Sequence, residues 1–193
     1  MKMMSDDQVD PLIEQILVEV GDCVRQVPAE SLTQAGALIE SSSRIFVAGA
    51  GRSGLCMRAF GMRLMHLGKT VHVVGETTTP GIAATDLLIL GSGSGRTASL
   101  VVMAEHACHL GANVLLFTTD SESPLARLAA LQVIIPAPSF RVMDDMHDSI
   151  SVQPLGTLFE QSMLILCDSL ILGLMRQFRV NAGQMFAHHA NLE

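Results

Sequence analysis

Short runs of apolar, mostly branched residues alternate with helical patterns along the middle of the chain. These β-rich runs cover residues 44–48, 70–74, 86–90, 113–118 and 132–135. The helices between them begin near Ser53, Thr97 and Ser123. Because strand and helix alternate, the strands should lie parallel in one sheet, with right-handed crossovers. The strands lack polar alternation, so helices should cover both faces. The pattern therefore predicts an α/β fold with a five-stranded, doubly wound parallel sheet in the strand order 2-1-3-4-5.

Helical patterns also flank the sheet region on both sides. Apolar residues recur at helical spacing over 9–24 and again over 31–42, and a long apolar helix is expected over 157–180. A chain of 193 residues fits one domain, since single cores usually hold about 100 to 200 residues. We therefore expect one domain over 1–193. It should comprise N-terminal helices (1–43), a sheet core (44–136), the long C-terminal helix (157–180) and a polar tail (181–193).

Composition and charge exclude several classes of protein. Hydrophobic residues make up 49% of the chain, enough for a large core and for contacts between subunits. The net charge of -7 has the wrong sign for a protein that binds nucleic acid through its phosphates. The four cysteines stand singly, without the spacing of a metal site or a disulfide framework. Such isolated thiols favour a cytoplasmic protein.

Neither secretion nor membrane insertion is expected from the apolar segments. Residues 1–10 are polar and acidic, unlike a secretory signal. The most apolar run, 158–175, contains Glu160 and Asp168, and charges at membrane depth are costly. We therefore expect this run to be a buried helix of a protein that does not enter a membrane.

Two segments rich in glycine and serine follow the first and third predicted strands. In the order 2-1-3-4-5, the chain reverses direction between these strands, and ligands bind at such a point. Hydroxyls and free amides at a helix N-terminus suit a phosphate monoester. The alternative is that the serines only cap the next helix and the glycines only turn the chain. The candidate ligand-binding residues are Gly51, Arg52, Ser53, Ser92, Ser94 and Thr97.

The first of these segments also allows a different function. Residues 49–54 fit the pattern G-x-G-x-x-G, and Glu76 lies near the position of the ribose-binding acid in dinucleotide folds. An NAD-dependent oxidoreductase is therefore an alternative. It does not explain the second glycine-rich segment, because a dinucleotide site needs only one such turn.

Four segments together resemble the 6-phospho-3-hexuloisomerase family, a branch of the SIS (sugar isomerase) domain proteins. They are AGAGRSG (48–54), GSGSG (91–95), QPLGTLFEQ (153–161) and MFAHHANLE (185–193). The resemblance implies an αβα sandwich, a homotetramer, no cofactor and isomerisation of D-arabino-hex-3-ulose 6-phosphate to fructose 6-phosphate. This reaction belongs to the ribulose monophosphate route of formaldehyde fixation. Arg96 departs from the acidic residue expected in close relatives, which affects the expected substrate preference.

Moving a carbonyl between C3 and C2 requires a base beside the carbon that loses its proton. Glu160 is the candidate, because the resemblance implies an active-site carboxylate in its segment. From the residues alone, Thr157 and Glu160 also fit a capping box, in which Thr157 is the N-cap. Glu76 is the reserve base, since its loop opens at the same edge of the sheet.

Two histidines near the C-terminus are candidates for assisting this chemistry. His188 and His189 can polarise a carbonyl or assist ring opening as neutral imidazoles. Chain ends are often disordered, which is the alternative. A tail that follows the last helix can instead enter the cleft of a neighbouring subunit.

No metal site is expected, although His147 stands in an acidic loop over 144–148. Within the same family, an isomerase for a pentose phosphate or a phosphosugar-binding sensor remains an alternative. Both would keep the two loops, but neither would use Glu160 as the acting base.

Overall fold

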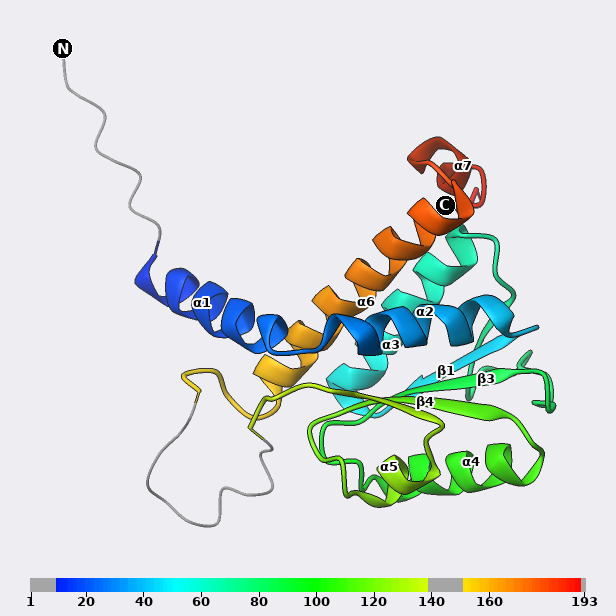
Figure 1. The fold of residues 1–193 in the computed structure, drawn as a ribbon, viewed down its shortest axis with the longest axis horizontal. Coiled ribbons are helices and arrows are strands. Elements are labelled where there is room, and N and C mark those ends of the chain that lie inside the picture. Colours follow the sequence, from blue (N-terminus) through cyan, green and yellow to red (C-terminus); the bar gives the residue numbers. More distant parts are fainter. Residues whose placement is uncertain (1–9, 139–150, 192–193) are drawn as a thin grey trace.

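The structure is a computed structural model that describes residues 10–138 and 151–191. Helices and strands alternate through its middle as the sequence predicts (Figure 1). The strands are β1 (Ile45–Gly49), β2 (Val71–Val73), β3 (Leu87–Gly91), β4 (Asn113–Thr118) and β5 (Leu131–Ile134). The helices are α1 (Pro11–Arg25), α2 (Ala29–Ser41), α3 (Gly51–His66), α4 (Ala98–His109), α5 (Pro124–Leu128), α6 (Thr157–Phe178) and α7 (Ala182–Phe186).

The five strands form one parallel sheet in the order β2-β1-β3-β4-β5, which confirms the predicted topology. The central pair, β1 and β3, is in register from Ile45 opposite Leu87 to Gly49 opposite Gly91. The two glycine-rich segments therefore leave the sheet side by side at its carboxyl edge.

Helices cover both faces of this sheet, so the molecule has three layers. Figure 1 shows α4 and α5 below the sheet, and α1, α2, α3 and α6 above it. Side chains alternate between the layers: Ile45 and Val47 of β1 pack above, whereas Phe46 and Ala48 pack below. Because both faces are buried, the two central strands β1 and β3 carry no polar side chain at any position.

The long C-terminal helix α6 lies in the upper layer against α1, α2 and α3. It is long and apolar enough to span a membrane, but half of its most apolar stretch is buried inside this fold. The buried residues include Phe159, Met163 and Cys167, which pack into the upper core. The helix is thus a core element, as the sequence predicts, and ends at Phe178 where Arg179 takes a left-handed conformation (φ 55°).

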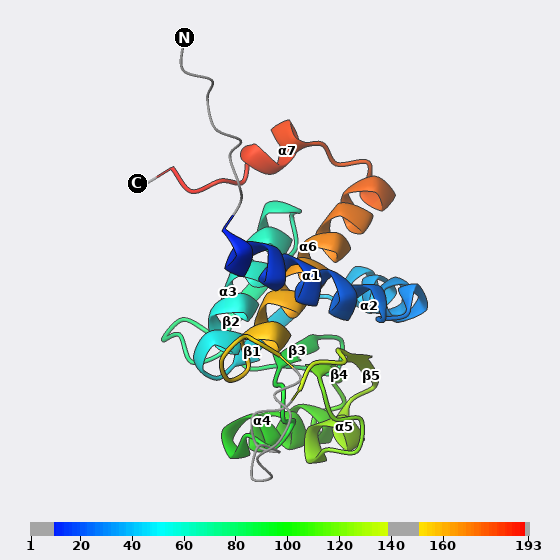
Figure 2. The same ribbon diagram turned by 90° about the vertical axis from the view of Figure 1, so that its left-hand side faces the viewer.

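The two ends of the described chain lie on the same side of the sheet. Figure 2 shows α1 crossing in front of α6, while α7 follows the far end of α6. The tail forms the short helix α7, capped by Asn181 and Gln184, where the sequence predicts only a polar tail. His188 ties it to α3, because its Nδ1 lies 3.0 Å from the carbonyl oxygen of His66.

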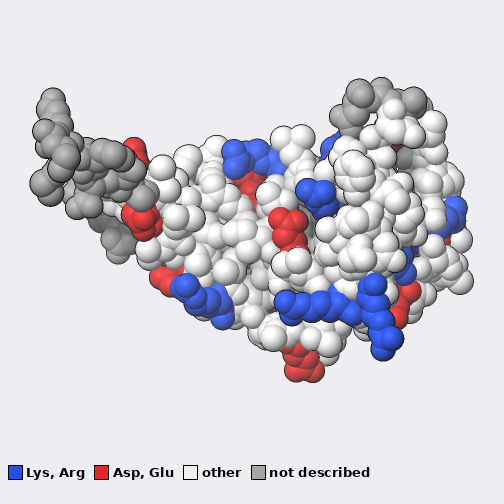
Figure 3. Space-filling model, turned by 90° about the horizontal axis from the view of Figure 1, so that it is seen from above, with Lys and Arg blue, Asp and Glu red and all other residues white. Residues whose placement is uncertain are grey.

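Several large apolar side chains of the upper layer are exposed. Seen from above, this face carries scattered charged groups with broad uncharged areas between them (Figure 3). The exposed apolar residues of α1, α3 and α6 are Leu12, Ile13, Leu17, Val18, Leu55, Met62, Met65, Ile165 and Leu172. The single chain therefore leaves apolar helix surface uncovered.

A buried ion pair joins β1 to β3 at the edge opposite the glycine-rich segments. Asp86 is 1% exposed, and its carboxylate accepts hydrogen bonds from Arg44 Nε (3.1 Å), Arg44 Nη2 (2.6 Å) and Ala83 N (2.7 Å). Burial raises the pKa of Asp86, but the bonds from Arg44 and Ala83 together hold it below its usual value. Asp86 is thus ionised at neutral pH.

Replacing this carboxylate should weaken the fold in a pH-dependent way. Asp86→Asn should lower the free energy of unfolding at neutral pH by about 1–3 kcal/mol, because an amide oxygen cannot satisfy all three donors. The pKa of Asp86 is lowered in the folded state, so its contribution is complete above the unfolded pKa and disappears as pH falls through the folded value. The difference between wild type and Asp86→Asn should therefore shrink below about pH 4. Urea unfolding at several pH values measures it.

Asp22→Asn is the matched control, since Asp22 pairs with Arg25 on the exposed surface of α1. Exposed pairs contribute little to stability, so this variant should unfold like wild type. Equal losses in the two variants would contradict a structural role for the buried pair.

Candidate functional site

A cavity of about 510 Å³ opens at the carboxyl edge of the sheet, above β1 and β3. It is bounded by three segments that are distant in sequence: the turns after these two strands and the start of α6. Its lining residues are Ala50, Gly51, Arg52, Ser53, Gly91, Ser92, Gly93, Ser94, Thr97, Thr119, Pro138, Leu155, Gly156, Phe159 and Glu160. The predicted switch point is therefore a real cleft, and both predicted loops line it.

The first turn is tight because two glycines lie against each other. A Cβ on Gly54 would lie 2.5 Å from the carbonyl oxygen of Gly49, so no side chain fits there. Gly51 begins α3 with φ 57°, two residues before the predicted start at Ser53. The start of α3, with Gly51, Arg52 and Ser53, thereby lines the cavity, and its first backbone N–H groups give this edge positive potential.

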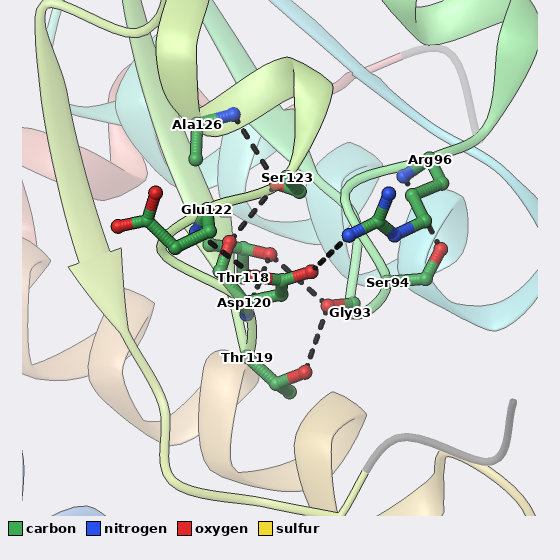
Figure 4. A network of polar contacts seen from close by, with 9 residues as sticks. All are labelled: Gly93, Ser94, Arg96, Thr118, Thr119, Asp120, Glu122, Ser123 and Ala126. Atoms are coloured by element: carbon green, nitrogen blue, oxygen red, sulfur yellow. Dashed lines mark hydrogen bonds and ion pairs between the residues drawn. The ribbon is translucent and has the colours of Figure 1, made fainter. Parts of the chain in front are cut away.

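The second loop is held from behind by the end of β4. Figure 4 shows the carbonyl oxygen of Gly93 at the centre of this network. It accepts hydrogen bonds from Thr118 Oγ1 (3.0 Å), Thr119 Oγ1 (2.9 Å) and Thr119 N (3.0 Å). Gly95 has φ 59°, and a Cβ there would lie 2.0 Å from Ser123 Oγ. The loop conformation is thus fixed before any ligand binds.

The hydroxyls of this loop are not used to cap α4. Thr97 is the N-cap residue of α4, yet its side chain forms no capping hydrogen bond. Ser94 Oγ accepts a weak bond from Arg96 N (3.3 Å), and Ser92 is buried at the cavity (4% exposed). The structure therefore does not support helix capping as the reason for these hydroxyls, which face a cleft that can hold an anion.

Arg96 points toward β4 and is absent from the cavity lining. Its Nη2 lies 2.8 Å from Asp120 Oδ2 (Figure 4). A hydrogen bond from the backbone of Glu122 and the charge of Arg96 lower the pKa of Asp120. Arg96 therefore braces the back of the loop through Asp120.

Glu160 reaches the cavity from the first turn of α6, and its side chain is 13% exposed. Its Oε2 lies 2.5 Å from Nε of Arg52, which comes from the first turn of α3. The capping-box interpretation is wrong: α6 begins at Thr157, and its N-cap is Gly156, without a side-chain bond. The carboxylate is free of a capping role because it binds Arg52 across the cleft. Cys56 lies close by, and burial together with the charge of Glu160 raises the pKa of its thiol.

The reserve candidate Glu76 is not brought to this cavity. It follows β2, is half exposed, and pairs with Arg58 at 2.9 Å. The structure therefore places Glu160, and not Glu76, beside the two loops.

The two C-terminal histidines also lie away from the cavity of their own chain. His189 stacks on His66 with ring centroids 5.4 Å apart, at the opposite end of α3 from Gly51. A helix of 16 residues is about 24 Å long, so the tail and the cavity are well separated. Burial lowers the pKa of His66, with Arg63, His189 and His188 adding to the effect.

Some lining residues were not predicted from the sequence. Thr119 follows β4, and the parallel sheet could have indicated it, because Phe117 pairs with Gly91. Leu155 and Phe159 form an apolar wall, and Leu155 takes φ 55°, for which the sequence carries no signal. No group of three or more possible metal ligands occurs in the part of the chain that the structure describes. The acidic loop with His147 lies outside the described residues.

The doubly wound sheet with a cleft at its switch point defines an α/β domain with a ligand site of the usual kind for such sheets. The model of the SIS domain family matches residues 38–153, more than half of the chain. The chain therefore belongs to the SIS domain family.

Similar proteins cover almost the whole length. A Mycobacterium gastri protein named 3-hexulose-6-phosphate isomerase is 44% identical, over 100% of this chain and 94% of the relative. A Bacillus subtilis (strain 168) protein of the same name is 42% identical, over 94% of this chain and 97% of the relative. A solved Methanococcus jannaschii structure, described as inferring a function of 3-hexulose-6-phosphate isomerase, has a TM-score of 0.81 at 30% identity. It covers 94% of this chain and 99% of that one.

Proposed function

We propose that this chain is an isomerase that interconverts D-arabino-hex-3-ulose 6-phosphate and D-fructose 6-phosphate in the cytoplasm, on the ribulose monophosphate route of formaldehyde fixation. The observation that carries the proposal is a single cavity that joins the hydroxyl-rich loop after β3 to the carboxylate of Glu160. The relatives named 3-hexulose-6-phosphate isomerase, 44% and 42% identical, support this substrate. All four cysteines are unpaired, as expected in a reducing compartment.

The phosphate end of the substrate binds at the two loops. Ser92, Ser94 and Thr97 donate hydrogen bonds to its oxygens, and the N-terminus of α4 adds positive potential. Gly51 and Ser53, at the start of α3, contribute from the opposite side. Local groups of this kind bind a dianion in spite of a net charge of -7.

Glu160 transfers the proton between the two carbons. It removes the C2 proton beside the C3 carbonyl, an enediolate forms, and the proton returns to C3, while the hydroxyl proton on O2 passes to O3, so that the carbonyl lies at C2. Phe159, which is 2% exposed, gives the cavity an apolar side next to the carboxylate. Arg52 orients Glu160 through their ion pair and can also contact a substrate oxygen. Neither a metal nor an organic cofactor is required by this chemistry.

His188 and His189 complete the site of a neighbouring subunit in a homotetramer. Two observations support this arrangement: the tail is ordered but distant from its own cavity, and α1, α3 and α6 expose apolar side chains. Self-association would cover this apolar surface.

The alternative functions differ in the ligand that the protein binds and in whether it turns over a sugar phosphate. A sensor of the same family would bind sugar phosphates without turnover. An NAD-dependent oxidoreductase would bind nicotinamide cofactor, which fluorescence titration detects. The pairing of Glu76 with Arg58 and the membership in the SIS family do not support that second alternative.

Glu160→Gln should abolish most turnover of the 3-hexulose 6-phosphate while leaving substrate binding nearly unchanged. Glutamine still accepts a hydrogen bond from Arg52 but cannot accept the carbon-bound proton, so kcat should fall about 10²-fold or more. Glu76→Gln is the control, because Glu76 lies outside the cavity lining. A collapse of turnover in the control, with an active Glu160→Gln enzyme, would assign the base to Glu76.

Ser94→Ala and Thr97→Ala should each weaken binding of inorganic phosphate and fructose 6-phosphate at least several-fold. Each variant removes a charge-assisted hydrogen bond of about 1.5–3 kcal/mol. Calorimetric titration measures the affinities, and Ser99→Ala on the exposed side of α4 is the matched control. Unchanged affinity in both loop variants, with the fold intact, is incompatible with the phosphate assignment.

Sedimentation should show a tetramer, and Leu172→Glu should dissociate it, because it places a charge on the exposed apolar surface of α6. Mixing inactive Glu160→Gln and His189→Ala subunits should restore part of the turnover if each site uses two chains. An active monomer, or no recovery after verified subunit exchange, would refute the shared site.

A further inference from the structure

The carboxylate of Glu19 links α1 to the segment that leads into α6. Its Oε2 accepts hydrogen bonds from Ser151 Oγ (2.8 Å) and Gln153 Nε2 (3.0 Å). Its Oε1 accepts one from Val152 N (2.8 Å). Three consecutive residues, more than 130 positions away in sequence, are thus held by one side chain.

The carboxylate of Glu19 is balanced by neutral hydrogen-bond donors and not by a positively charged side chain. It forms no ion pair with any residue in the described ranges 10–138 and 151–191. Burial raises the pKa of Glu19, but the bonds from Gln153, Val152 and Ser151 together bring it below its usual value. The carboxylate is therefore ionised at neutral pH and can hold all three donors at once.

Only a few residues separate this contact from the cavity. Gln153 is buried (8% exposed), and Leu155 and Gly156 already line the cavity. Thr157 N then donates to Pro154 O (3.2 Å), and Glu160 N donates to Gly156 O (3.0 Å). A shift of Ser151–Gln153 would therefore also move Leu155 and Gly156 at the cavity and the first turn of α6.

We propose that Glu19 is a positioning residue of the proposed isomerase, which sets the cavity wall at Leu155 and Gly156 and the placement of Glu160. This role rests on the proposed function, since Glu160 acts as the base there. Glu19 itself is not a lining residue of the cavity. It acts through the segment that it holds.

The loop that binds phosphate is supported separately. Gly93 is fixed by Thr118 and Thr119 at the end of β4, and neither of these residues contacts Glu19 or the segment that Glu19 holds (Figure 4). Loss of the Glu19 contact should therefore disturb proton transfer and spare phosphate binding. Proton transfer is the more sensitive of the two, because displacements of about 1 Å can slow a reaction about 10²-fold.

Glu19→Gln tests the role, since one amide oxygen cannot replace two carboxylate oxygens and its NH₂ group faces other donors. With the 3-hexulose 6-phosphate as substrate, kcat should fall about tenfold or more. The inhibition constant of inorganic phosphate should stay within about twofold of wild type. Glu14→Gln is the matched control: it lies on the same helix, is exposed, and loses the same charge. It should behave like wild type.

Ser151→Ala provides a second variant that keeps Glu19 in place. It removes one of the three donors, so kcat should fall in the same direction but less. The double variant Glu19→Gln/Ser151→Ala should lose less than the product of the two single effects, because the two residues share one contact.

The outcomes separate the positioning role from the proposed function. Normal kcat in Glu19→Gln, beside active wild type and Glu14→Gln, would overturn the positioning role alone. A parallel loss of kcat and phosphate binding with a lower melting temperature would also overturn it, since it indicates a general structural role. A wild-type enzyme that does not isomerise the substrate refutes the proposed function and the positioning role with it.

Discussion

The parallel pairing of β1 with β3 determines where the cavity lies and which two turns line it. Because Gly49 lies opposite Gly91, the turns after both strands leave the sheet at the same level. The first turn leads directly into α3 and the second, over residues 92–97, leads into α4, so the starts of two helices with free amides lie near one cleft. The Asp86–Arg44 pair secures the other end of the same two strands. The position of the cleft is thus a consequence of strand order and register.

The remaining part of the site is built from outside this sheet. Helix α6 crosses the upper layer and brings Glu160 to the cleft, where Arg52 meets it. In the proposed mechanism, the sheet supplies the phosphate site and α6 supplies the base. The distance between these two groups then depends on how α6 is seated, and Glu19 on α1 contributes to that seating through the segment before α6. If Glu19 has the proposed positioning role, α1 contributes to catalysis from outside the sheet.

Much of the fold was predictable because it depends on local periodicity. The strands lie within a residue or two of their predicted bounds, and Gly68 and Gly111, which follow α3 and α4 in the sequence, take the positive φ that glycine allows at helix ends. The two loops were predictable as well, since topology alone brings them together. The partner of Glu160 was not, because Arg52 lies 108 positions away and no local pattern records the contact. The prediction of a capping box was wrong for a related reason. The N-cap of α6 is Gly156, so the side chain of Glu160 is available for its contact with Arg52.

In the proposed function, this cavity catalyses proton exchange on a ketose phosphate. The sharpest test is incubation of the purified protein with fructose 6-phosphate in heavy water, with the carbon-bound deuterium followed by mass spectrometry and NMR. Deuterium should appear on the carbon beside the carbonyl in wild type, at a rate that depends on enzyme concentration. Binding of fructose 6-phosphate without any incorporation would contradict it, and would leave a phosphosugar-binding protein that does no chemistry.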